Sequence, residues 1–144
     1  MPYNRKALEQ VREWARGEKN GIRLDMGNWV KTEDGTEYSC LTAACIGGWT
    51  VHHAGAEFIW PQHMSSAVRQ CRLDGIAMYV SEAAARILGI TEEEAYVLFD
   101  LNQENPEEDP DGPSLAFLDY LVKRAQKGLR NMSDEEVDDW VPDN

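Results

Sequence analysis

Apolar residues recur at helical spacing near the start of the chain. After Asn4, whose amide suits an N-cap, the pattern predicts a helix that runs to about Arg16 and ends at Gly17. The apolar stripe of this helix consists of Leu8, Val11, Trp14 and Ala15. These positions lie three or four residues apart, so they share one face that a core must cover.

The last third of the chain repeats this pattern. Ser114 begins a predicted amphipathic helix that runs to about Leu129. Its apolar stripe consists of Leu115, Leu118, Leu121, Val122 and Ala125. Ser133 and Glu136 then have the spacing of a capping box, which predicts a short tail helix.

Two short helices are predicted in the stretch SEAAARILGITEEEAYVLF. Ser81 caps the first and Gly89 stops it, whereas Thr91 and Glu94 form a capping box for the second. Two helices joined by LGIT resemble a helix-turn-helix, whose second helix enters the major groove of DNA. Here the second helix begins with three glutamates, which DNA phosphates would repel. We therefore expect a packing unit and no direct DNA binding.

The middle of the chain contains one strong hairpin signal. Polar and apolar residues alternate in WVKTEDGTEYS around Asp34 and Gly35, which predicts a small two-stranded ribbon lying against helices. Further along, AEFIWPQHMSSAVRQCRLDGIAMYV has no dominant period. Pro61 excludes a continuous helix there, and only MSSAVRQC is interpreted as a helical turn or two.

The stretch SCLTAACIGGWTVHHAG is dense in small and reactive residues. Ser39 caps a predicted helix from about Leu41 to His53. Glycine inside a helix costs about 1 kcal/mol relative to alanine, so we expect another element to pack closely on Gly47 and Gly48. The fold class predicted for the whole chain is mainly α: one compact domain over residues 1–144, with about five to six helices and a small two-stranded β-hairpin.

Cysteine and histidine residues are the candidates for metal binding or nucleophilic catalysis. Cys45 and His52 lie seven residues apart and share a helical face, but Cys40 and Cys45 are five apart and would not converge on a helix. A nucleophilic Cys40 would need a base, and His52 is three turns away. We therefore expect buried core thiols, no metal and no cofactor. A small zinc-binding or cysteine-dependent enzyme built on Cys40, Cys45 and His52 remains the alternative.

Charge is distributed unevenly along the sequence. Residues 1–90 carry ten acidic and ten basic residues, whereas residues 91–144 carry sixteen acidic and four basic ones, which accounts for the whole net charge of −12. A nucleic-acid surface needs clustered Lys and Arg, so this distribution argues against one. It permits a protein partner with a basic surface, and it is also typical of an acidic face that simply keeps the protein in solution.

Cysteine number and hydropathy favour a cytoplasmic location. Three cysteines, an odd number, do not suit a secreted disulfide framework. No apolar run approaches the ~18 residues that a membrane span needs, and the first residues lack an apolar signal core. We therefore expect a cytoplasmic protein without a membrane anchor.

Two motifs carry a resemblance to a known group of proteins. The first consists of Cys40, Thr42, Cys45, Gly48 and Trp49, and the second of Ala84, Ala85, Leu88, Gly89, Leu98 and Phe99. Together they resemble a family of small actinobacteriophage proteins with a Cys-x-Thr-x-x-Cys-x-x-Gly-Trp core. The resemblance covers residues 24–100, within a core of residues 1–100. It implies a phage origin and the host cytoplasm, and it implies no particular chemistry. Residues 101–144, an acidic loop plus C-terminal helices, lie outside it.

No catalytic constellation is recognisable in the sequence, so a binding function is favoured over an enzyme. We expect a phage accessory protein that binds a host or phage macromolecule through its acidic C-terminal third. The candidate binding residues are Glu107, Glu108, Asp109, Asp111 and Trp49. A third class, a protein that sequesters a small ligand such as a nucleotide, would use Trp29, Trp49 and Trp60 to line a pocket.

Overall fold

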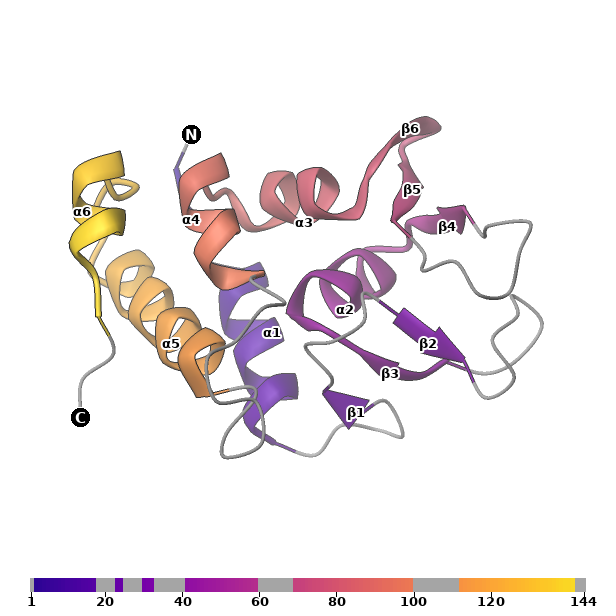
Figure 1. Cartoon of the computed structure of the whole chain (residues 1–144), viewed down its shortest axis with the longest axis horizontal. Coiled ribbons are helices and arrows are strands. Elements are labelled where there is room, and N and C mark those ends of the chain that lie inside the picture. The colour runs from indigo at the N-terminus through magenta and orange to yellow at the C-terminus, as the bar shows by residue number, and fades with distance from the viewer. Residues whose placement is uncertain are drawn as a thin grey trace.

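The computed structural model of the chain describes residues 2–17, 23–24, 30–32, 41–59, 69–99 and 112–141 (Figure 1). Helices and two small sheets make up this part. The helices are α1 (Arg5–Arg16), α2 (Ile46–His53), α3 (Val80–Leu88), α4 (Glu92–Leu98), α5 (Gly112–Gln126) and α6 (Asp134–Asp139). The strands are β1 (Arg23–Leu24), β2 (Val30–Thr32), β3 (Leu41–Ala44), β4 (Glu57–Ile59), β5 (Gln70–Leu73) and β6 (Ile76–Tyr79).

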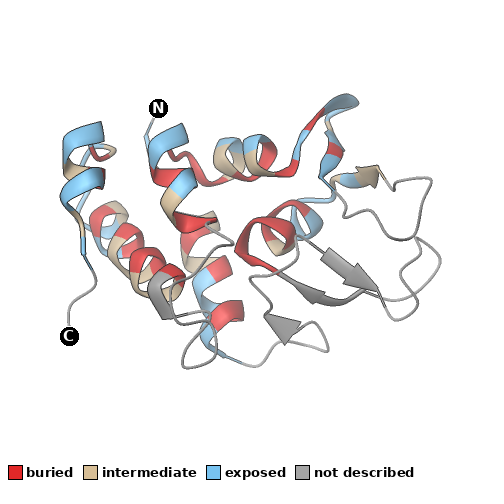
Figure 2. Ribbon diagram, in the orientation of Figure 1, coloured by how far each residue is buried: buried red, intermediate tan, exposed pale blue. Residues whose placement is uncertain are grey.

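The helices pack around one apolar core. Helix α1 packs against α5, α2 packs against α3, and α4 contacts both α5 and α6. The buried faces of these helices turn toward one another, whereas α6 is exposed over most of its surface (Figure 2). The largest side chains removed from water include Leu8, Ile46, Leu88, Leu98, Phe117, Leu118 and Leu121. Burying a side chain of this size stabilises the fold by roughly 1.5–3 kcal/mol.

Helix α1 confirms the prediction made from its apolar stripe. Its four predicted core residues are buried, and the Asn4 side chain accepts a hydrogen bond from the Ala7 N–H. The solvent-facing side of α1 is tied to α5 by ion pairs. Arg12 and Arg16 both contact the Asp119 carboxylate, at 2.8 and 2.6 Å. The first helix and the C-terminal third therefore belong to one packed unit.

The predicted ends of the later helices are mostly right. The Thr91–Glu94 capping box of α4 and the Ser133–Glu136 capping box of α6 are both formed. Helix α3 ends at Gly89, which has the left-handed φ of 69°. Its start is corrected, because α3 begins at Val80 directly after a strand and Ser81 lies inside it.

The predicted bounds of α5 are also corrected. Helix α5 begins at Gly112, two residues before the expected Ser114, and ends at Gln126 rather than near Leu129. Gly128, with a φ of 70°, lies just beyond this end. Residues in the left-handed region cannot continue a right-handed helix, so the chain turns there toward α6.

The expected helix from Leu41 to His53 is wrong in its first turn. Residues Leu41–Ala44 form strand β3, and α2 begins only at Ile46. The N-cap is Cys45 rather than Ser39, which lies outside the described residues. β3 is the central strand of a sheet with the order β1-β3-β2, paired parallel to β1 and antiparallel to β2. Pairing on both sides outweighs the local helical pattern of Leu-Thr-Ala-Ala.

The predicted two-stranded ribbon becomes part of this three-stranded sheet. Its first strand is confirmed as β2, but β2 pairs with β3, and the predicted turn at Asp34–Gly35 lies outside the described residues. The chain is mainly α as expected, with three-stranded sheets in place of a single two-stranded hairpin.

A second, antiparallel sheet occupies the stretch in which no dominant period is visible. Its strand order is β4-β5-β6, and it includes Gln70 and Cys71, which were expected in a helical turn. Strands β5 and β6 are joined by Asp74 and Gly75, with φ values of 53° and 80°. Positive φ at both central residues is the signature of a tight hairpin turn, and Asp-Gly is a preferred sequence for it.

Candidate functional site

Three aromatic rings stack at the contact between α1 and α2. The Trp49 ring lies 5.0 Å from the Trp14 ring and 4.6 Å from the His53 ring, with an interplanar angle of 10° in each case. Trp14 is buried, Trp49 is half-buried and His53 is exposed. The stack therefore runs from the core to the surface.

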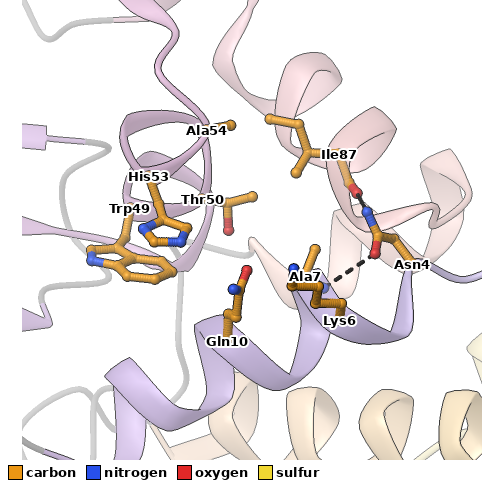
Figure 3. A pocket seen from close by; sticks show the side chains of 9 residues that line it. All are labelled: Asn4, Lys6, Ala7, Gln10, Trp49, Thr50, His53, Ala54 and Ile87. Atoms are coloured by element: carbon orange, nitrogen blue, oxygen red, sulfur yellow. Dashed lines mark hydrogen bonds between the residues drawn. The ribbon is translucent and has the colours of Figure 1, made fainter.

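A cleft of about 260 Å³ opens beside this stack (Figure 3). Three helices provide its walls, namely the first two turns of α1, the end of α2 and the last turn of α3. Trp49 and His53 stand on one side, and Ile87 closes the other. The complete lining is Asn4, Lys6, Ala7, Gln10, Trp49, Thr50, His53, Ala54 and Ile87. This volume lies just below the roughly 300–1,000 Å³ of typical small-molecule sites.

Some polar groups of the cleft are already used by the fold. The Thr50 hydroxyl donates to the Ile46 carbonyl at 2.7 Å, and the Asn4 side chain bonds at both its oxygen and its nitrogen. Lys6 and Gln10 have no hydrogen-bond or ion-pair partner in the part of the chain that the structure describes. These two side chains and His53 are therefore the groups that could contact a ligand.

Sequence reasoning identified Trp49 but missed its neighbours in the cleft. Lys6 and Gln10 are one helical turn apart beside the buried stripe of α1, so a polar pair on one face was visible in the sequence. Nothing local indicated that α2 would place His53 opposite them. Trp29 and Trp60, the other proposed pocket residues, lie outside the described residues.

Cys45 is a capping residue at the start of α2. Its Sγ accepts a hydrogen bond from the Gly48 N–H at 3.3 Å, and the residue is fully buried. Cys71 is also buried, on β5, and burial raises the pKa of its thiol. A raised pKa disfavours the thiolate, the form that acts as nucleophile and metal ligand.

Of the proposed metal ligands, the structure describes Cys45 and His52, and it does not bring these two together. His52 is exposed on α2 while Cys45 is buried at its start, and Cys40 lies outside the described residues. Partial desolvation and the neighbouring His53 lower the pKa of His52. Within the described ranges, no group of three His, Cys, Asp or Glu side chains could hold a metal ion.

Carboxylates gather on the two contacting helices α4 and α6. Glu92 and Glu93 are exposed on α4, and Tyr96, 79 % exposed, follows them by one turn. The exposed acids of α6 are Asp134, Glu135, Asp138 and Asp139. We call these six acids and Tyr96 the acidic surface. The four predicted loop acids, Glu107, Glu108, Asp109 and Asp111, lie outside the described residues.

One carboxylate near this surface is instead buried. Glu94 accepts hydrogen bonds from the Tyr3 hydroxyl, the Asn131 side chain (2.9 Å) and the Met132 N–H (3.2 Å). It is fully removed from solvent, and its capping-box bond to the Thr91 N–H completes its set of partners. Because its lone pairs are occupied by structural donors, we interpret Glu94 as a structural residue.

Comparisons of the chain with protein-family models, with curated proteins and with solved structures found no match. The helices in the described part are each too short or too polar to cross a bilayer.

Proposed function

We propose that the chain is a non-enzymatic phage accessory protein that binds a macromolecular partner with a basic surface through its acidic C-terminal third. The observation that carries the proposal is the acidic surface on α4 and α6. Six exposed carboxylates lie on these two contacting helices, and the exposed Tyr96 ring lies on α4 one turn after two of them. Clustered negative charges attract a basic partner over distance and speed its encounter. An exposed aromatic residue beside them can anchor the contact.

The arginines near α6 do not neutralise these six carboxylates. Arg130 lies 2.7 Å from Glu136, and Arg124 lies 4.0 Å from the same residue. Glu136 belongs to the capping box and is not one of the six. In the described part of the chain, the six acids have no ion pair. Their negative field is therefore directed toward solvent.

Two of the six acids do not stabilise the helix that carries them. Asp138 and Asp139 lie in the last turn of α6, where the helix dipole is negative. A carboxylate at that end is unfavourable, by about 0.3–1 kcal/mol at low salt. Acids kept where they weaken a helix are better explained by binding than by folding.

The proposal is tested by capture from an actinobacterial lysate on the immobilised chain, with elution by increasing salt. We expect the captured protein to be basic and to elute as salt screens the contact. The double variant Asp138→Asn with Asp139→Asn should release it at lower salt, because it removes two charges without harming α6. Tyr96→Ala should weaken capture severalfold while leaving unfolding unchanged, since its side chain is largely exposed.

A matched control removes two negative charges elsewhere. Glu13→Gln with Asp74→Asn changes exposed residues on α1 and on the β5–β6 turn, and asparagine suits the positive φ at position 74. This control should elute like the wild type. Elution that does not depend on salt concentration would contradict the proposal. So would an equal weakening of capture in the control and in the α6 variant. Neutralising Glu107, Glu108, Asp109 and Asp111 together tests the contribution of the loop.

The cleft beside Trp49 supports a second candidate function, the binding of a small planar anion such as a nucleotide. Its Lys6 side chain supplies a positive charge, and His53 presents an aromatic ring already aligned by Trp49. In a thermal-shift screen with nucleotides and metabolites, a true ligand should raise the Tm of the wild type but not of Lys6→Ala. Arg5→Ala, an exposed cation outside the cleft lining, is the control. No shift across the panel would remove support for this candidate.

A further inference from the structure

Strand β6 lies at one edge of the sheet β4-β5-β6. The hairpin it forms with β5 extends away from the helices at the upper right of Figure 1. Within the described part of the chain, β6 is paired on its β5 side only. The backbone and side-chain groups on the unpaired side of β6 therefore determine what this strand can bind.

The register shows which backbone groups point away from β5. The Val80 N–H donates to the Arg69 carbonyl at 2.9 Å, so residues 80 and 69 form a hydrogen-bonded pair. Hydrogen-bonded and non-bonded pairs alternate along an antiparallel ladder. Met78 and Ile76 therefore bond to β5, whereas Ala77 directs its N–H and carbonyl outward and Tyr79 directs its N–H outward. The Tyr79 carbonyl starts helix α3.

This edge lacks the features that protect most outer strands. Natural edges carry Lys or other charges, proline or a bulge that prevents pairing with another strand. The sequence Ile-Ala-Met-Tyr has no charge and no proline, and the described β5–β6 ladder has a regular register. Ile76 and Tyr79 are 60 % and 59 % exposed. An uncharged strand with exposed large side chains is a template for pairing.

We propose that β6 pairs antiparallel with β6 of a second copy of the chain, across a twofold axis. In the register that opposes Tyr79 to Ala77 of the second copy, each Tyr79 N–H donates to an Ala77 carbonyl. Ala77 and Tyr79 share one face of the sheet, because side chains two residues apart do so. Each tyrosine ring then lies over a small alanine side chain. The pairing joins the two sheets into one six-stranded sheet.

The charge distribution favours a second copy as the occupant. Helix α6 carries five acidic residues and no basic one, and it lies at the opposite end of the molecule from the hairpin (Figure 1). Pairing through β6 therefore holds the two acidic ends apart. An antiparallel twofold contact also uses the same groups twice, so it requires no complementary sequence from another protein.

Sedimentation velocity at two salt concentrations tests the dimer. The series should reach about 1 mM protein, because so short an edge buries less than a standard interface of about 1,600 Å². We expect a monomer–dimer equilibrium that changes little between about 50 and about 500 mM NaCl, because backbone hydrogen bonds make the pairing and the acidic ends are held apart. Capture of the basic partner should instead weaken as salt rises, so the two proposals fail separately.

Two variants test the edge itself. Ala77→Lys places like charges near each other across the twofold axis and should weaken the dimer at least about tenfold. Ala77→Pro places a proline ring where the second strand must approach, and it removes an N–H that has no partner on β5, so the fold should persist without the dimer. Gln70→Lys adds the same charge to the same face of β5, one strand from the edge, and should still dimerise.

A chain that remains monomeric at both salt concentrations would overturn the proposal, as would a dimer that persists in both Ala77 variants. Hydrogen exchange provides an independent measurement. The amide of Tyr79 should become protected as protein concentration rises. Protection that depends only on an added partner would instead indicate that a foreign segment occupies this edge.

Discussion

Asn4 and Gly89 connect the start of α1 to the end of α3. The Asn4 side chain caps α1 through its oxygen, and its nitrogen donates to the Ile87 carbonyl at 2.8 Å. The Asn4 N–H donates to the Leu88 carbonyl at 2.9 Å. One residue therefore satisfies the unpaired backbone groups of two helices. Gly89 permits this approach, because a Cβ there would lie 2.3 Å from the Pro2 carbonyl oxygen.

Gly89→Ala should destabilise the protein strongly. The residue would have to hold a left-handed conformation, which costs about 1–2 kcal/mol, and would also push Pro2 and Asn4 away. We expect a total loss of about 3–4 kcal/mol in urea unfolding. Gly128→Ala is the control, because its φ of 70° matches the 69° of Gly89 and no atom lies within 4 Å of its Cβ. Equal losses in both variants would show that the Pro2 contact is unimportant.

At the scale of elements, local signals predicted the helices whose ends are set by their own residues. The capping boxes at Thr91 and Ser133 and the stop at Gly89 depend on neighbours in sequence, and all three are present. Strand β3 could not be predicted this way, because it is held by pairing with β1 and β2 and not by its own residues. The β5–β6 turn repeats the Asp-Gly dipeptide used to predict the earlier hairpin, so its signal was present but lay after a stretch without alternation.

The candidate sites, like the elements, could be predicted only where the signal is local in the sequence. The acidic character of α4 and α6 could be predicted because charge is a local property of the sequence. Trp49 was singled out as a binding residue, but Lys6, Gln10 and His53 were not, since the cleft exists only when α1, α2 and α3 meet. The outward groups of β6 depend on the register of its pairing with β5, which composition does not determine.

Helix α6 should depend on the ionisation of Glu136. The hydrogen bond from the Ser133 N–H and that from Arg130 lower the pKa of this carboxyl from 4.5 to about 2. A lowered pKa in the folded state means that the carboxylate stabilises the fold above pH 4.5, and that this contribution is lost as the pH falls toward 2. Glu136→Gln should therefore unfold more readily than the wild type at neutral pH.

The difference between wild type and Glu136→Gln should narrow progressively as the pH falls from about 4.5 to about 2. Thermal unfolding followed by circular dichroism over this range measures it. Glu135→Gln removes the same charge from an exposed neighbour that has no hydrogen bond in the described part of α6. A pH-independent difference for Glu136→Gln would contradict the assigned role of the carboxylate.

At the scale of the whole molecule, the buried Glu94 joins segments from both ends of the chain. Tyr3 reaches it from the N-terminal segment, while Asn131 and Met132 reach it from the connection between α5 and α6. Arg124 of α5 donates to the Tyr3 hydroxyl at 3.3 Å and to the Arg130 carbonyl at 2.7 Å. This network holds the acidic C-terminal helices against the N-terminal segment, so it fixes where the acidic surface lies.

The network should make stability sensitive to alkaline pH through Tyr3. Burial, and then the hydrogen bond to the Glu94 carboxylate, raise the pKa of the Tyr3 phenol above its ordinary value of about 10. The folded state therefore holds this proton more tightly than the unfolded state. The resulting stabilisation is complete below pH 10 and declines as the pH rises above it. Tyr3→Phe should cost about 1–2 kcal/mol at neutral pH, because Glu94 loses one donor.

Urea unfolding of both proteins from neutral pH to about pH 11.5 separates this effect from general alkaline unfolding. The free energy of unfolding of the wild type should exceed that of Tyr3→Phe below pH 10, and the two values should converge above pH 10. Tyr96→Phe, which removes an exposed hydroxyl, should follow the wild type at every pH. If the stability curves of wild type and Tyr3→Phe stay parallel, the hydrogen bond to Glu94 does not keep the Tyr3 phenol protonated in the folded state. The link between the N-terminal segment and the C-terminal helices would then depend on the packing of α1 against α5 and on the ion pairs of Arg12 and Arg16 with Asp119.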